Sequence, residues 1–322
     1  MIYHAHTKDK YIHCVDVEKL VHKPNDELKL KFVNLFGKTV ELYDDPWMWH
    51  LHLKITDICN AHCAFCVEKN CVRNENPKHF LENLDKMLSE MEAAGILYSV
   101  SVTGGEPTLF KQFADLCNVL KKHNIKFLTM NTNGYGLKKF HDDIDGLFDW
   151  VNISRHRMTD EENFEIFKTD SIPSIAELKE IRNSFKHTKM RIQCVMEFVN
   201  TPERMMEFAN VFSFADDISF RRLMKLGEEF GLNYNIGEDK YIICLEWCFK
   251  NLKFVEQTIQ DYYVYEIYEM PNGKNVTFSY SNMKMLRELE HVESENKIRE
   301  FIIHPNGLVS GSWKMDTKII LK

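Results

Sequence analysis

No stretch of this 322-residue chain holds enough consecutive apolar residues to span a bilayer. The N-terminus, MIYHAHTKDKYIHC, is polar and lacks the apolar core of a secretory signal. The sequence also contains no internal repeat and no low-complexity tract. These absences argue against a membrane-spanning protein, an exported protein and a solenoid, so we expect a globular protein of the cytoplasm.

An excess of positive charge is missing as well, because 41 Lys and Arg face 48 Asp and Glu, which gives a formal net charge of -7. A chain with this balance has no overall attraction for phosphate backbones, so nucleic acid is not an expected partner. Hydrophobic residues at 44% and charged residues at 28% are close to the average of soluble globular proteins. We therefore expect an ordinary folded core.

Between residues 49 and 226 short apolar runs alternate with longer amphipathic segments, which is the pattern of repeated β-α units around a parallel sheet. The expected strands are Trp49–Ile55, Tyr98–Thr103, Lys126–Asn131, Trp150–Ser154, Met190–Met196 and Ile218–Met224. The expected helices are His79–Ala94, Phe110–His123, Ile175–Ser184 and Pro202–Phe214. Six units are too few to close an eight-stranded barrel, so we predict an α/β fold with a partial (β/α)6 TIM-like barrel whose functional loops follow the strands.

Two flanking regions complete the predicted organisation around the core at 49–226. Residues 1–48 are expected to form an N-terminal appendage with a small hairpin around Gly37. Residues 227–322 are expected to form an α+β extension that acts as a substrate cap, with aromatic residues concentrated in Asp261–Tyr268. Such aromatic residues lie in the core more often than on a recognition surface.

Nine cysteines without an export signal indicate reduced thiols rather than a disulfide framework. Four crowd into thirteen residues, two form a second pair, and three stand alone as expected buried hydrophobic side chains. In that order they are Cys59, Cys63, Cys66 and Cys71; Cys244 and Cys248; and Cys14, Cys117 and Cys194.

The first three of the crowded cysteines form a C-x3-C-x2-C arrangement directly after the first expected strand, in LKITDICNAHCAFCVEKNC. Closely spaced thiolates on a polar loop suit either zinc or an iron–sulfur cluster. Zinc would normally need a fourth ligand, for which Cys71, His62 and His50 are candidates. A four-iron cluster held by three cysteines would instead leave one iron open to a small molecule.

This spacing, with an aromatic residue before the last cysteine, resembles the signature of the radical S-adenosylmethionine (SAM) superfamily. The resemblance implies that Cys59, Cys63 and Cys66 hold a [4Fe-4S] cluster, that SAM binds the open iron and that Phe65 lies near the adenine. It also implies that reductive cleavage of SAM yields a 5'-deoxyadenosyl radical, which abstracts hydrogen from a bound substrate. Cys71 has no counterpart in the motif and is not expected to be a ligand.

A second segment, SVTGGEPTLF, follows the second expected strand and resembles the GGEP motif of the same superfamily. Gly104 and Gly105 would allow the backbone to approach a ligand, and Glu106 would accept hydrogen bonds from the ammonium group of SAM. The alternative is an ordinary glycine turn before a helix that begins at Pro107. The cysteine motif on the preceding strand favours the SAM site.

Six further positions on or directly after the later strands resemble the superfamily, and the segment NISRHRMTDEENFEIF resembles that of relatives of the molybdenum-cofactor cyclisation enzyme. The asparagines would bond the ribose or the SAM carboxylate, unless they only stabilise a turn. The arginine after the fourth strand would bind a carboxylate through its planar fork, with its neighbouring serine also facing SAM. The last two would face the adenosine or the substrate. In chain order the six are Asn131, Asn133, Ser154, Arg155, Gln193 and Arg221.

The C-terminal extension lacks cysteines that many superfamily members use for auxiliary clusters. The stretch IIHPNGLVSGSW resembles the segment that carries such a ligand, but Ser312 stands where the cysteine would be. Cys244 and Cys248 alone do not complete a site that usually takes three or four thiolates. We therefore expect one cluster.

The resemblance implies an enzyme whose partners are SAM, an electron donor such as flavodoxin or ferredoxin, and a substrate. The substrate would be either a small metabolite, such as a nucleotide or sugar, or a ribosomally made peptide. Two other interpretations stay open. One is a zinc-knot binding protein without catalysis, in which Cys71 is the fourth ligand. The other is a regulator that binds cluster and SAM without turnover.

Overall fold

The computed structural model describes residues 2–13, 29–46, 49–66, 76–223, 238–282, 285–286, 289, 293–313 and 318–322. Cys14, Cys71 and the predicted strand end at Met224 lie outside these residues. In the part of the chain that is described, no helix has the length and apolar character needed to cross a membrane.

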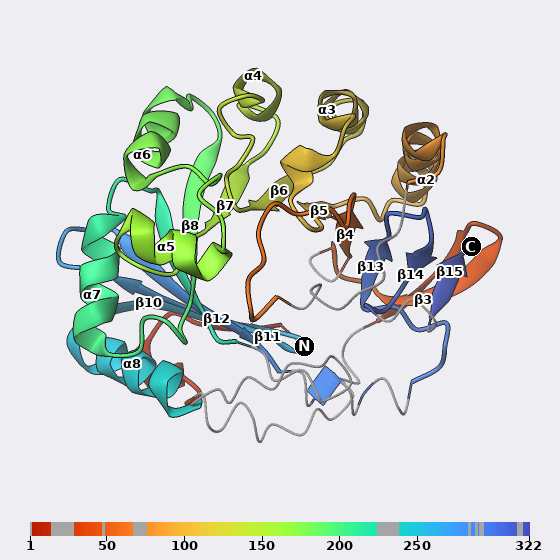
Figure 1. The fold of residues 1–322 in the computed structure, drawn as a ribbon. Coiled ribbons are helices and arrows are strands. Elements are labelled where there is room, and N and C mark those ends of the chain that lie inside the picture. Colours follow the sequence, from red (N-terminus) through yellow and green to blue (C-terminus); the bar gives the residue numbers. More distant parts are fainter. Residues whose placement is uncertain are drawn as a thin grey trace.

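Thirteen strands of the described residues form one curved, open sheet. Its centre consists of parallel strands, which are β4 (His50–Lys54), β5 (Ser99–Thr103), β6 (Phe127–Thr132), β7 (Trp150–Ser154), β8 (Lys189–Val195) and β9 (Asp217–Arg221). The connecting helices are α2 (Phe80–Ala93), η3 (Pro107–Leu109), α3 (Phe113–Leu120), α4 (His141–Ile144), α5 (Asp160–Phe167), α6 (Ile175–Ser184) and α7 (Pro202–Val211). Figure 1 shows α2, α3, α4, α6 and α7 along the outside of the curve. The predicted α/β fold with a partial TIM-like barrel is confirmed.

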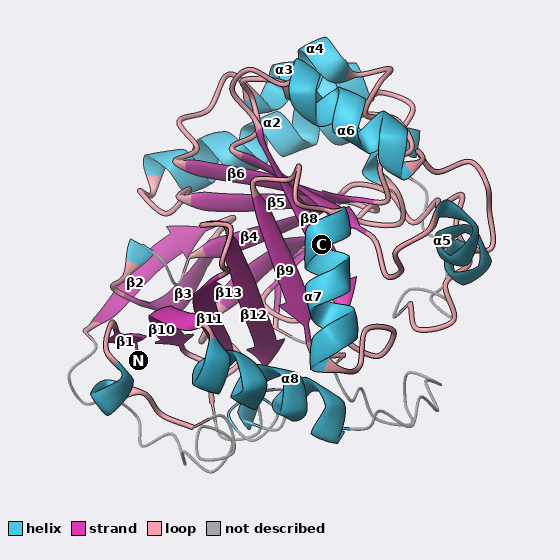
Figure 2. Ribbon diagram, turned by 90° about the vertical axis from the view of Figure 1, so that its left-hand side faces the viewer, coloured by secondary structure: helices cyan, strands magenta, loops and turns pink. Residues whose placement is uncertain are grey.

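Strands from the C-terminal extension continue the sheet at both edges. β12 (Asn275–Ser281) pairs in parallel with β9, and β13 (Glu300–Ile303) pairs in parallel with β4. Antiparallel strands follow on each side, namely β11 (Tyr263–Glu269), β10 (Lys253–Gln260) and β1 (Ile2–Ala5) beyond β12, and β14 (Val309–Ser310) and β15 (Ile319–Leu321) beyond β13. α8 (Glu238–Asn251) lies below this region (Figure 2).

The N-terminal region contributes to two sheets. β1 belongs to the main sheet, whereas β2 (Leu30–Leu35) and β3 (Lys38–Tyr43) form a separate two-stranded hairpin. Gly37 makes the turn with φ +78, a conformation that favours glycine. The hairpin around Gly37 is thus present, and the domain boundaries at residues 48 and 226 stay a prediction.

The central strands expose one apolar and one polar face, because successive side chains of a strand point to opposite sides. Leu51 and Leu53 of β4 and Ile218 and Phe220 of β9 are buried in the core shared with the helices. The other face carries polar residues along every central strand. They include His50, His52, Ser99, Ser101, Thr129, Asn131, Asn152, Arg191, Gln193, Asp217, Ser219 and Arg221. The inner face of the curve is therefore chemically suited to a polar ligand.

A buried carboxyl group joins the N-terminal segment to the extension. Glu266 accepts hydrogen bonds from Tyr268 Oη at 2.9 Å, Tyr11 Oη at 3.0 Å and Gln257 Nε2 at 3.1 Å. Gln257 also bonds the backbone N–H and C=O of Ile12. Burial raises the pKa of Glu266 to about 7, and the three hydrogen bonds only partly oppose it.

This carboxyl should give the protein a measurable pH dependence of stability. A pKa that is higher in the folded state means that the folded protein holds the proton more tightly, so the stabilisation is complete below about pH 4.5 and is lost as pH rises toward 7. Relative to Glu266→Gln, the wild-type free energy of unfolding should fall across this window by up to about 1.4 kcal/mol per pH unit. Urea denaturation at stepped pH measures it.

Glu269→Gln is the matched control, because Glu269 lies on the same strand and pairs with Lys253 at a partly exposed site. It should keep the wild-type slope. A Glu266→Gln variant with the wild-type slope would contradict the assignment.

Candidate functional site

The predicted site residues gather at one edge of the sheet, where the loops after β4, β5, β6 and β7 meet. Cys59, Cys63 and Cys66 are partly buried on the loop after β4. Burial raises the pKa of the Cys63 thiol to about 12, and the neighbouring thiols of Cys66 and Cys59 add to this effect. The three thiols therefore lie within electrostatic range of one another. His62, one of the candidate zinc ligands, is exposed.

Gly104 and Gly105 hold the cysteine loop against the loop after β5. A Cβ atom on Gly104 would lie 2.3 Å from the carbonyl oxygen of Thr56, and one on Gly105 would lie 2.3 Å from that of Ile58. The same contacts include hydrogen bonds from Gly105 N–H to Thr56 and from Glu106 N–H to Ile58. The sequence predicts that the backbone at these glycines comes close to a ligand. In the structure the backbone comes close to the cysteine loop.

Glu106 is fully buried and connects the loops after β5 and β6. Its Oε1 accepts from Thr108 N–H at 3.1 Å, Thr108 Oγ1 at 2.6 Å and Thr132 Oγ1 at 2.7 Å. Its Oε2 accepts from Asn133 N–H at 2.7 Å. Desolvation raises its pKa, although these hydrogen bonds act in the opposite direction. The carboxylate thus positions two loops, and its contact with the SAM ammonium stays a prediction. Pro107, also buried, begins the short helix η3.

Asn133 extends this connection to the cysteine loop. Its Nδ2 donates to Asn60 Oδ1 at 2.7 Å, and Asn60 Nδ2 donates to Ser171 Oγ at 3.0 Å. The fully buried Arg155 donates to the carbonyl oxygens of Asn133 at 3.0 Å, of Ser154 and of Pro173. Its Nε has no partner among the described residues. Arg155 therefore fixes the backbone of the site, and its predicted role toward a SAM carboxylate is untested.

Phe65 belongs to an aromatic cluster beneath the cysteine loop. Its ring centroid lies 5.0 Å from His156, edge to face, and 5.4 Å from Phe198. His156 also stacks on Phe167 at 5.4 Å. Burial lowers the pKa of His156 to about 3, so this ring is neutral. Sequence reasoning missed His156, although it follows Arg155 directly in the same segment.

The residues present fit an iron–sulfur cluster and a polar cofactor better than a single metal ion. Among the described residues, no three His, Cys, Asp or Glu side chains are grouped closely enough for one ion. A four-iron cluster binds each cysteine through a different iron, so its ligands lie farther apart. Arg155 Nε, after β7, is a buried polar atom without a hydrogen-bond partner in the described part of the chain.

Further polar residues follow the inner face below the loops. Asn131 Nδ2 donates to Ser101 Oγ at 2.9 Å, and Asn152 Nδ2 donates to Asn131 Oδ1 at 3.1 Å. Asn131 thus belongs to a chain of side chains across β5, β6 and β7. Gln193 and Arg221 lie farther along, on β8 and β9, and both are partly buried.

Sequence reasoning missed a cluster that joins the two edges of the parallel region. Glu300 on β13 accepts from His52 Nε2 of β4 at 2.9 Å and from Tyr263 Oη of β11 at 3.4 Å. Tyr262 Oη donates to Tyr263 Oη at 3.2 Å, and the Trp313 ring lies 4.7 Å from His52. The alternation in HLHLK already indicated two inward histidines. The carboxylate partner of His52 lies 248 residues away in the chain.

The tail aromatics divide between core and surface. Tyr262 and Tyr268 are buried as expected, but Tyr265 and Trp313 are 37% and 40% exposed. Cys117 and Cys194 are buried, and so are Cys244 and Cys248 on α8, where Cys248 Sγ contacts Met205 Sδ at 3.7 Å. This second cysteine pair therefore packs in the core.

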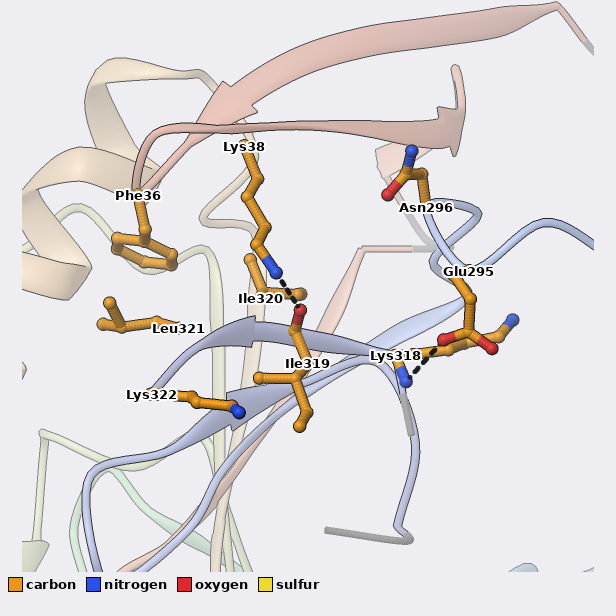
Figure 3. A pocket seen from close by; sticks show the side chains of 9 residues that line it. All are labelled: Phe36, Lys38, Glu295, Asn296, Lys318, Ile319, Ile320, Leu321 and Lys322. Atoms are coloured by element: carbon orange, nitrogen blue, oxygen red, sulfur yellow. Dashed lines mark hydrogen bonds between the residues drawn. The ribbon is translucent and has the colours of Figure 1, made fainter. Parts of the chain in front are cut away.

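A separate hollow of about 550 Å³ lies between the hairpin β2–β3 and β15 (Figure 3). Lys38 Nζ donates there to the carbonyl oxygen of Ile319 at 2.7 Å, and Lys318 Nζ donates to that of Lys297 at 2.8 Å. Both lysines thus already donate hydrogen bonds to backbone oxygens of the protein. None of the residues that line this hollow belongs to the loops after β4, β5, β6 and β7.

Comparison with known families identifies the core. Residues 53–212 match the model of the Radical SAM superfamily. The GTP 3',8-cyclase of Actinobacillus pleuropneumoniae serotype 5b is 28% identical over 191 residues, which cover 56% of this chain and 54% of the relative. That of Pectobacterium atrosepticum is 36% identical over 95 residues, which cover 28% and 29%. The chain spans about half the length of the curated relatives it matches.

Solved structures share the fold. Streptococcus suis SuiB bound to S-adenosylmethionine aligns with a TM-score of 0.59 and 15% identity, covering 84% of this chain and 62% of SuiB. SuiB bound to precursor peptide SuiA gives a TM-score of 0.57 and 16% identity, covering 82% and 59%. At this identity the likeness concerns the fold alone.

Replacing Glu106 should loosen the loops that it connects. In Glu106→Gln an amide group would face at least one N–H or O–H donor, which should lower the free energy of unfolding by about 1–3 kcal/mol. It should also speed hydrogen exchange at the Asn133 amide. Urea denaturation and exchange spectroscopy measure these effects. Glu161→Gln, exposed on α5, is the control, and equal effects of the two variants would show that the carboxylate does not position the loops.

Proposed function

The chain belongs to the radical SAM superfamily, and from this membership we propose that it is an enzyme that cleaves SAM reductively and abstracts hydrogen from a bound substrate. Radical SAM enzymes use a [4Fe-4S] cluster and SAM. The proposal rests above all on one observation. Three partly buried cysteines lie on the loop after β4, and the start of this loop at Thr56 and Ile58 packs against the glycine pair that follows β5.

In this proposal Cys59, Cys63 and Cys66 hold the cluster. The bound cluster supplies the electron that breaks a carbon–sulfur bond of SAM, giving methionine and the 5'-deoxyadenosyl radical that takes hydrogen from the substrate. The protein orients the reactants and excludes water. The rigid loops around Glu106 and Asn133 keep the cysteine loop in one position, which supports this role.

SAM lies along the strand ends in this proposal. Phe65 flanks its adenine, Gly104 to Pro107 border its amino group, and the side chains after β6 and β7 face its ribose and carboxylate. These last are Asn131, Asn133, Ser154 and Arg155. Gln193 and Arg221 face the adenosine or the substrate. The polar inner face supports this placement, because it offers donors and acceptors beyond the cysteine loop.

The reducing electron comes from a small redox protein such as flavodoxin or ferredoxin. Relatives named GTP 3',8-cyclase point to a nucleotide, and SuiB, solved with a precursor peptide, points to a peptide. Both substrate classes stay in the proposal.

Cysteine variants test the proposal. After anaerobic reconstitution with iron and sulfide, the wild type should show cluster absorption and release 5'-deoxyadenosine from SAM in the presence of a reductant. Cys63→Ala should lose both, because the cluster needs all three thiolates. Cys71→Ala, a nearby cysteine outside the C-x3-C-x2-C motif, should keep both. Iron analysis, absorption spectra and chromatography of the nucleoside measure these outcomes.

Two rival outcomes are distinct. Bound zinc that is lost equally from Cys63→Ala and Cys71→Ala would indicate a zinc-knot protein. A reconstituted cluster without 5'-deoxyadenosine would indicate a regulator that binds the cofactors without turnover. Either result would refute the proposed enzyme.

A further inference from the structure

Three ion pairs lie on the inner face of the central strands, and the exposed Lys189 at the start of β8 lies over the Trp150 ring. The pairs are Lys54 with Asp57 at 2.8 Å, His52 with Glu300 at 2.9 Å, and Arg191 with Asp217. Arg221 is partly buried and has neither a hydrogen-bond acceptor nor an ion-pair partner for its side chain among the residues described. Guanidinium groups stay charged in proteins, so an unpaired one that is partly withdrawn from water is unfavourable until an anion binds.

The position of Arg221 directs it into the curve of the sheet. It is the last residue of β9, where the alternating residues Ile218 and Phe220 are buried on the helix side. Its register partner on β12 is Ser279, and the partner of Ser279 on β11 is Tyr265. Arg221 therefore lies at the end of the strand through which the core joins the extension.

Two tyrosines of β11 lie across β12 from this guanidinium, and Tyr265 is in register with it through Ser279. Burial raises the pKa of Tyr263 and of Tyr265, and the charge of Arg221 opposes that effect at both phenols. Both phenols stay protonated; that of Tyr263 donates its proton to Glu300, whereas that of Tyr265 can donate to a ligand. Tyr265 is 37% exposed, so the group is accessible from solvent. Gln193 on β8, whose amide has no partner within the described chain, extends the polar surface.

We infer that Arg221, with Tyr265 in register on the same face two strands away, binds an oxyanion of the substrate, either a carboxylate or a phosphate. A guanidinium fork matches both anions through two parallel hydrogen bonds, and the phenol of Tyr265 adds a neutral donor. This inference rests on the proposed function and narrows its substrate to an anionic molecule. The site combines a core strand with a strand of the extension, so the extension sets part of the specificity.

Distance separates this group from the proposed anchor of SAM. Five strand-to-strand steps lie between β4 and β9. At about 4.8 Å for each step, they amount to roughly 24 Å along the curved sheet. In the proposed function the amino group of SAM lies at the loop after β5, and its carboxylate already faces the side chains after β6 and β7, including Arg155. The anion on Arg221 is thus assigned to the substrate.

Anion titrations test the inference. Cluster-reconstituted protein with SAM is titrated anaerobically, by calorimetry at constant ionic strength, with pyrophosphate in one arm and citrate in the other. We expect the wild type to bind one of them, pyrophosphate if the substrate carries phosphate and citrate if it carries carboxylate. Arg221→Gln should weaken that binding at least tenfold, and Arg221→Lys should weaken it less, because it keeps the charge without the fork.

Arg204→Gln is the charge-matched control, because Arg204 is partly exposed on α7 and approaches Glu162 only at 4.0 Å. It should change anion affinity less than twofold. The inference is overturned if neither anion binds the wild type, if Arg221→Gln binds as the wild type does, or if Arg221→Gln loses SAM affinity to the same degree. None of these results alters the iron content or the SAM cleavage of the wild type, which test the proposed function separately.

Discussion

A carboxylate removed from water must find hydrogen-bond donors, and in this protein that requirement fixes the functional edge of the sheet. Glu106 finds its donors on Thr108, Thr132 and Asn133, so the loops after β5 and β6 have one favourable relative position. Asn133 passes that order to the cysteine loop through Asn60. The location of the three cysteines thus depends on the Glu106 carboxylate, although no described contact joins this carboxylate to a cysteine directly.

The C-terminal extension is part of the same interior. Strands of a partial barrel leave two open edges, and open edges need cover. Here β12 covers one edge and β13 the other. Glu300 then connects the two sides through His52 and Tyr263. Ligand-facing residues are therefore supplied jointly by the core and by the extension, although the two are far apart in sequence.

Much of the core was predictable because parallel strands buried against helices leave strong apolar runs. The bounds of β7 and α6 agree with the prediction, and the other central strands differ at their ends by one to three residues. The prediction missed α8, whose buried positions Tyr241, Cys244, Leu245 and Cys248 have helical spacing. Their spacing was the available signal, but the two cysteines were considered as ligands. β10 to β12 were likewise not separated in a region dense with aromatic residues.

The site itself was only partly predictable. Motif spacing located the cysteine loop and the glycine pair, since both depend on neighbouring residues. It could not show that the glycines pack on the carbonyl groups of Thr56 and Ile58, or that Arg155 is bonded to three carbonyl oxygens. Such contacts join loops that approach only after the sheet has formed. The same holds for Glu300, which lies 248 residues from His52.

The two faces of the central strands perform different tasks. Apolar side chains such as Leu53 and Phe220 hold the helices and account for the cohesion of the fold, whereas polar ones such as Gln193 and Arg221 face the interior of the curve. Substitutions on the interior face thus leave the helix-facing core intact. Over evolutionary time such an arrangement allows descendants of one ancestor to diverge in what they accept while retaining the same foldable framework.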